Sequence, residues 1–225
     1  MTLHRESVTA GAVVVLATAD ADAKAGLAIE LDEIWRDTEN VILGDSRPPL
    51  RPARPSQPVL LAPGKVPRRR INRGIKGRIA LLHALAHIEL NAIDLACDII
   101  ARFAPTTYLP EAFTKDWIRV AADEARHFRL LSARLQEFDT RYGDLPAHDG
   151  LWEAAENTAH DLRARLAVVP LVLEARGLDV TPMMIEKLRA AEDIGPRKMC
   201  DAVKDERLRS WERDGRKGRR DSVAV

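Results

Sequence analysis

The chain has 225 residues, of which 46% are hydrophobic and 31% are charged. This length and hydrophobic content suffice for one well-buried core and predict one main domain. Its formal net charge of +1 gives no overall field that would indicate a nucleic-acid partner. Aromatic residues amount to only 4%, and the abundance of Ala, Leu and Arg favours helices over sheets. Cys97 and Cys200 form no C-x-x-C motif, so we expect neither a disulfide framework nor a zinc knuckle, which fits a cytoplasmic location.

Residues 1–43 are interpreted as an N-terminal helical segment. The apolar run from Ala10 to Leu16 is short and soon followed by charged residues, so it does not match an export signal. We expect no stretch long enough to span a bilayer, and therefore no membrane partner. The segment is predicted to form an amphipathic helix on the outside of a bundle, with Ala19, Ala23 and Leu27 facing inward.

Residues 44–70 form a proline-rich strap. Proline fixes the backbone dihedral φ and removes an amide donor, so neither a helix interior nor a central strand is expected here. Arg68, Arg69 and Arg70 make its end basic, and a solvated connector is favoured over a phosphate-binding arm.

A long helix is predicted from about Ile75 to Phe103, ending before a proline. Its inward stripe is apolar except for Glu89, which places one carboxylate in the core. His83 and His87 lie one turn apart but lack the H-E-x-x-H context of a zinc site, so they are interpreted as supporting or surface groups. Asp94 and Asp98 of the same helix are candidates for pairing with arginine.

A second helix is predicted from about Glu111 to Arg141, and the short connection before it predicts an antiparallel arrangement. Glu124 and His127 form an E-x-x-H pair in the middle of its apolar stripe. Because a buried ionised carboxylate must be paired, protonated or bound to a metal, this pair is a candidate ligand pair. The alternative is a hydrogen-bonded buried pair with no metal.

A third helix is predicted from about Leu151 to Arg176, kinked at Pro170, and its inward stripe includes His160, Ala164 and Glu174. A fourth helix begins at Thr181. Glutamates on three apolar helix faces, together with E-x-x-H, favour a dinuclear site in an all-α bundle, because such sites use carboxylate oxygens and imidazole nitrogens.

The sequence resembles an uncharacterised ferritin-like family, labelled a domain of unknown function and related in architecture to carboxylate-bridged di-iron proteins. The resemblance covers most of residues 62–182 and rests on four stretches: KVPRRR, LLHALAHIELNAIDLACDIIARF, DWIRVAADEARHFRLLSARL and HDLRARLAVVPLVLEARGLDVTP. It implies a ferritin-like four-helix bundle with iron, or alternatively manganese, held by Glu89, Glu124, His127 and Glu174.

The C-terminal part departs from the family pattern. A second E-x-x-H pair is expected on the fourth helix, but the counterpart by offset is Glu206 with Arg209, and a guanidinium does not ligate metals. Gly195 and Pro196 also interrupt that helix. The fourth helix is therefore interpreted as incomplete and the second half-site as impaired. The bundle is assigned to residues 71–195 and a divergent basic tail to residues 196–225.

The leading hypothesis is a ferritin-like, oxygen-dependent di-iron oxidoreductase or hydroxylase acting on an unknown small-molecule or macromolecular substrate. A non-catalytic scaffold or partner-binding bundle is the first alternative. An RNA-modifying hydroxylase-like protein is the second, although nucleic acid is not the expected partner. A homodimer remains open.

Overall fold

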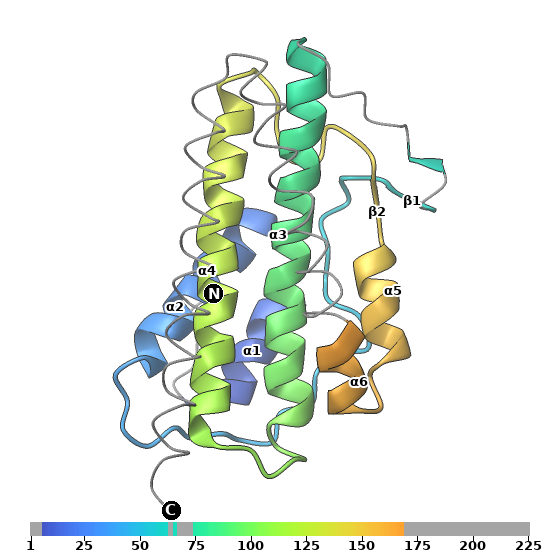
Figure 1. The fold of residues 1–225 in the computed structure, drawn as a ribbon. Coiled ribbons are helices and arrows are strands. Elements are labelled where there is room, and N and C mark those ends of the chain that lie inside the picture. The colour runs from blue at the N-terminus through green and yellow to red at the C-terminus, as the bar shows by residue number, and fades with distance from the viewer. Residues whose placement is uncertain (1–5, 63–64, 67–73, 169–225) are drawn as a thin grey trace, which may run out of the picture.

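The structure is a computed structural model that describes residues 6–62, 65–66 and 74–168 (Figure 1). Two long helices, α3 (Ile75–Phe103) and α4 (Glu111–Gln136), run side by side in opposite directions. The expected antiparallel pair is therefore present, and α3 has the predicted bounds. The inward stripe of α3 is buried, including Leu82, Ile93 and Ile100. The predicted second helix ends earlier than expected, because Asp139 adopts a positive φ of 52° just after the last helical turn.

The N-terminal segment forms two helices, α1 (Val8–Ala17) and α2 (Ala21–Trp35), instead of one. Each begins at a side-chain cap: the Ser7 hydroxyl accepts from the amide of residue 10, and the Asp20 carboxylate accepts from the amide of residue 23. The helices are thus separate because Asp20 starts a new helix where α1 has just ended.

The prediction of an amphipathic helix on the outside is wrong for α1. This helix carries no charged residue, and Val8, Ala12, Val15 and Leu16 are fully buried in the main core. The inward candidates are also partly wrong, because Ala19 and Ala23 are exposed, whereas Leu27 is buried. The N-terminal helices therefore supply a large part of the core, with α1 packed on α3 and α2 packed on α4.

Residues 44–62 of the strap contain no helix, as the prolines predict. Within residues 44–62, the one regular element is β1 (Leu60–Leu61), which pairs in parallel with β2 (Ala147–His148). Gly44, at the start of the strap, has a φ of +77°, and a Cβ there would collide with the side chains of Ser7 and Thr9. Glycine at this position lets the strap turn closely past the start of α1.

The predicted third helix is broken in the structure. Its described part consists of α5 (Gly150–Asn157) and α6 (Leu162–Leu166), separated by a turn. The Thr158 hydroxyl bonds back to the carbonyls of residues 154 and 155, and Asp161 caps α6 by accepting from the amide of residue 164. As a result His160, expected to face inward, is exposed. Pro170, the fourth helix from Thr181, the tail and Arg68–Arg70 lie outside the described residues.

Within the described part of the chain, α3 is the one helix whose length and composition would let it cross a membrane. The sequence-based expectation that no stretch was long enough is therefore wrong on those two criteria. However, 72% of its most apolar window is buried inside the protein, which the central helix of a globular core also shows.

Buried charges hold the outer segments against α3. Asp94 and Asp98 are both fully buried and lie one helical turn apart. Asp94 pairs with Lys24 of α2 and with Arg54 of the strap, while Asp98 pairs with Arg165 of α6. Each carboxylate thus joins α3 to a segment distant in sequence. The expected pairing of these aspartates with arginine is confirmed.

Replacing Asp98 tests this role. Asp98→Ala leaves the Arg165 guanidinium, only 1% exposed, without its carboxylate partner. Loss of one member of a buried pair costs about 3–5 kcal/mol, so we expect a loss of this order in urea unfolding. The matched control is Glu137→Ala, which removes an exposed partner of Arg134 on α4 and should cost below about 1 kcal/mol. Equal small losses in both variants would show that Asp98 does not anchor α6.

Candidate metal centre

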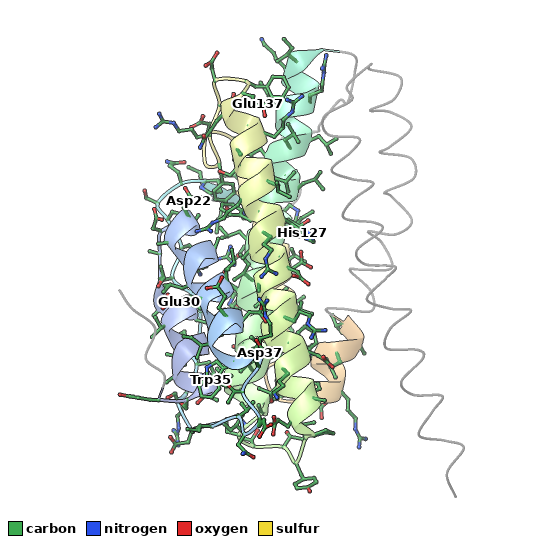
Figure 2. All side chains as sticks on the ribbon, turned by 90° about the vertical axis from the view of Figure 1, so that its left-hand side faces the viewer. Asp22, Glu30, Trp35, Asp37, His127 and Glu137 are labelled. Atoms are coloured by element: carbon green, nitrogen blue, oxygen red, sulfur yellow. The ribbon has the colours of Figure 1, made fainter. Side chains whose placement is uncertain are left out.

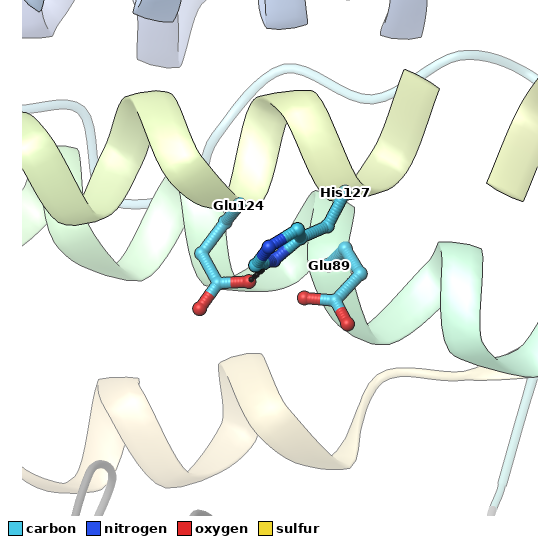
Figure 3. Close-up of side chains that lie close together, drawn as sticks. All are labelled: Glu89, Glu124 and His127. Carbon is cyan, nitrogen blue, oxygen red and sulfur yellow. Dashed lines mark hydrogen bonds and ion pairs between the residues drawn. The ribbon is translucent and has the colours of Figure 1, made fainter. Parts of the chain in front are cut away.

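Glu89 of α3 and Glu124 and His127 of α4 come together in the middle of the helix pair (Figure 3). Each residue offers one ligand atom, and these atoms all lie within 4.8 Å of one another. The three residues are 6%, 7% and 5% exposed, respectively. Within the described residues, this is the only group of three or more His, Cys, Asp or Glu side chains with such convergence.

The local sequence explains the convergence. Residues three apart on a helix lie on the same face, so the spacing of Glu124 and His127 aims a carboxylate and an imidazole in one direction. Glu89 lies near the middle of α3, and the antiparallel packing of α3 on α4 brings it opposite this pair. The E-x-x-H motif and a single glutamate on the partner helix are therefore sufficient to assemble three ligands.

The cluster lies on one particular face of the helix pair. His127 projects from the side of α4 turned away from Glu30 and Trp35 of α2 (Figure 2). Figure 3 agrees, because the N-terminal helices lie beyond α4 on the side opposite the three side chains. The main core, to which α1 and α2 contribute, and the candidate centre thus occupy opposite faces of the α3–α4 pair.

One hydrogen bond within the cluster defines its electrostatics. His127 Nδ1 lies 3.1 Å from Glu124 Oε2, a distance at which Nδ1–H donates to the carboxylate. A divalent cation could replace this proton between the two side chains, because metal ligands must present lone pairs. The arrangement is therefore one in which a cation could take the place of this proton.

The fourth predicted ligand, Glu174, lies outside the described residues. His83 and His87 are buried rather than exposed, so their interpretation as possible surface groups is wrong. His83 Nε2 accepts from the Gly143 amide at 2.9 Å. His87 is bonded at both ring nitrogens, as described below, so neither histidine presents a free nitrogen pair for chelation.

Sequence reasoning missed Tyr142, which lies at the centre of an aromatic and hydrogen-bonded cluster. Its ring stacks on His83 and meets the Phe128 ring edge-on, and its hydroxyl lies 2.9 Å from His87 Nδ1. Tyr142 follows a helix end in a turn-rich segment, where no periodicity marks a residue as buried. No local sequence signal could have revealed it.

The contact with the His148 carbonyl assigns the tautomer of His87. Asn91 Nδ2 lies 3.2 Å from Nε2 but donates to the His87 carbonyl at the shorter distance of 2.7 Å. The His148 carbonyl can only accept, so Nε2–H donates to it at 3.0 Å. Nδ1 of the neutral ring then accepts from the Tyr142 hydroxyl. Burial lowers the pKa of His87 to about 4, opposed by the His148 carbonyl, so the ring is neutral near neutral pH.

Comparison with known proteins identifies the family. Residues 17–207 match the model of a family described as "Protein of unknown function (DUF455)", so the chain belongs to that family. The match includes α2, α3, α4 and all of the predicted ligands. The family description states no activity.

A relative in Haemophilus influenzae (strain ATCC 51907 / DSM 11121 / KW20 / Rd), described as "Uncharacterized protein", is 46% identical over 153 residues. The aligned part is 66% of this chain and 53% of the relative, so the chain spans about half the length of the curated relative it matches. No solved structure shows a significant match to the chain.

The state of His87 gives a pH prediction. Its folded pKa of about 4 lies below the ordinary 6.5, so the unfolded chain binds the extra proton between these values. The contribution of His87 to the free energy of unfolding should therefore be fully present above pH 6.5. It should be lost as the pH drops through the folded value, a loss of up to about 3 kcal/mol. His87→Gln should remove this part of the slope in pH-dependent urea unfolding. An unchanged slope in the variant would exclude a buried neutral His87.

Proposed function

We propose that the protein is a metal-binding member of its family, with Glu89, Glu124 and His127 as ligands of a divalent cation. The observation that carries the proposal is the convergence of three buried ligand atoms from two helices within 4.8 Å. A buried carboxylate pair is expensive to maintain unless a cation or protons neutralise it. A dication would neutralise both carboxylates at once.

The donor set suits iron or manganese. Two carboxylate oxygens and one imidazole nitrogen are ligands that ferrous and manganous ions accept, whereas the absence of thiolate among the three disfavours a soft metal. Three protein ligands leave coordination positions open for water or a small molecule. Glu174, proposed from the sequence, would be a further ligand. It would be the first residue available to bind a second ion.

We further propose a ferritin-like architecture and an oxygen-dependent di-iron oxidoreductase or hydroxylase activity on an unknown substrate. Support comes from two long antiparallel helices, of which one carries a central glutamate and the other an E-x-x-H pair, the pattern of carboxylate-bridged sites in helical bundles. The chain spans about half the length of its curated relative. Any activity of the whole protein is therefore part of this proposal.

Each of the three residues would have a defined role at a loaded centre. Iron in this position would supply binding and reduction of dioxygen. Glu89 and Glu124 would set the charge of the centre, and His127 would give up its Nδ1 proton on loading if that nitrogen is the ligand atom. The burial of all three side chains limits the access of bulk water to the centre.

A non-catalytic scaffold is the second candidate. The 3.1 Å hydrogen bond between His127 and Glu124 favours it, because it shows that these two groups can satisfy each other without a metal. The two candidates differ in whether the purified protein retains a cation.

Metal analysis of the full chain, purified without chelator, tests the proposal. We expect iron or manganese in near-stoichiometric amount in the wild type and at least about tenfold weaker retention in Glu89→Gln and Glu124→Gln, because each variant removes one anionic ligand. Glu137→Gln is the matched control, since Glu137 is an exposed glutamate at the C-cap of α4, the helix that carries Glu124. It should retain the wild-type content.

Retention should also weaken as the pH falls, because protons compete with the cation for His127 and the two glutamates. If folded wild-type protein holds no more iron or manganese than Glu124→Gln after supply of either ion, the metal proposal is wrong. The scaffold reading would then be preferred.

A further inference from the structure

A second buried polar cluster lies away from the candidate centre, where α2, α3 and the strap meet. We call Lys24, Arg54 and Asp94 the strap latch. The Lys24 ammonium contacts Asp94 Oδ1 and donates to the Ala53 carbonyl of the strap at 2.9 Å. Arg54 Nη2 lies 2.9 Å from Asp94 Oδ2. Lys24 and Asp94 are fully buried, and the Arg54 side chain is 16% exposed.

The strap latch has more positive than negative charge. With Lys24 protonated, two cations share one carboxylate. The other groups around it do not supply the missing charge, because burial raises the pKa of the Cys97 thiol, which stays protonated, and the Asn91 amide is neutral. Helix α1 has no ionisable residue, and Arg129 of α4 approaches α2 at Gly26 with a further positive charge.

The Arg54 guanidinium is only partly hydrogen-bonded. Its Nη2 donates to Asn91 Oδ1 at 2.8 Å and lies 2.9 Å from Asp94 Oδ2, whereas Nε and Nη1 are buried without an acceptor among the described residues. A guanidinium remains protonated at all ordinary pH values, but a lysine amine can lose its proton. Lys24 is thus the group through which the latch can become electrically neutral.

We propose that protonation of Lys24 opposes docking of the strap, which is held in place by Arg54 on Asp94. The strap is therefore docked more firmly when Lys24 is neutral. A neutral amine still has two hydrogens for Ala53 and Asp94, so both contacts survive the loss of the proton. The closed latch is then one guanidinium paired with one carboxylate. Protonation adds a second cation to a buried site, which favours release of the strap.

The direction of the pH effect follows from linkage. Burial lowers the pKa of Lys24 below its ordinary 10.5, the Arg54 charge lowers it further, and Asp94 opposes both. A released strap would let the amine regain its ordinary pKa, so the open form binds more protons. Docking is therefore strongest above the ordinary pKa and weakens as the pH falls toward and through the lowered value.

Hydrogen exchange of the full chain tests the latch. The Ala53 amide donates to the Leu16 carbonyl at 2.8 Å and reports strap docking. Its protection factor, which corrects for the intrinsic exchange rate, should fall as the pH is lowered from the ordinary lysine pKa of 10.5 toward the lowered pKa of Lys24, by up to about tenfold per pH unit. In Lys24→Met, which leaves Arg54 paired with Asp94, the protection should be retained and its pH dependence lost.

The control is Lys76→Met, which changes an exposed lysine near the start of α3 and should keep the wild-type profile. Loss of protection in Lys24→Met at every pH would make Lys24 a simple anchor and overturn the proposal, as would a wild-type slope in that variant. If Lys24→Met does not fold, the same exchange measurement on Arg54→Gln tests the proposal. Asp94 then neutralises protonated Lys24, and the pH dependence should flatten, whereas an unchanged slope would overturn the proposal.

Discussion

The structure depends on one constraint, which is that charge taken out of water must meet opposite charge or a hydrogen-bond partner. Helix α3 meets this constraint on two faces. Toward the strap and α6, Asp94 and Asp98 meet cations that come from other segments of the chain. Toward the candidate centre, Glu89 converges with Glu124 and His127, and the His127 imidazole donates to the Glu124 carboxylate. The buried acids of α3 therefore determine which segments pack against it and where a cation would be bound.

The sequence predicted the parts of the fold in which periodicity is strong. The bounds of α3 and its antiparallel pairing with α4 follow from long stripes of apolar residues, and the proline content of the strap excluded helices there. The failures occurred where periodicity is weak or broken. In α1 nearly every residue is apolar, so no polar face marks its orientation. At Thr158 one helix ends and at Asp161 another begins, where the apolar pattern alone would continue a single helix.

The candidate site was predictable to the extent that it depends on helix geometry. Glu89, Glu124 and His127 could be assigned because helical spacing and an antiparallel neighbour fix the direction of each side chain. Tyr142 was not predictable, since it lies in a turn. Lys24 could have been recognised: it continues the buried stripe of Ala21, Ala25 and Ala28, and a charged residue in such a stripe requires a buried partner. That partner, Asp94, is 70 residues away and is visible only in three dimensions.

The arrangement of the two faces has an evolutionary consequence. Because α1 and α2 cover the side of the α3–α4 pair opposite Glu89, Glu124 and His127, substitutions among these three would leave the apolar contacts of the N-terminal half intact (Figures 2 and 3). A lineage that lost these three side chains could therefore retain its shape, while a lineage that altered its N-terminal packing could keep them. The two properties can diverge independently within one short polypeptide.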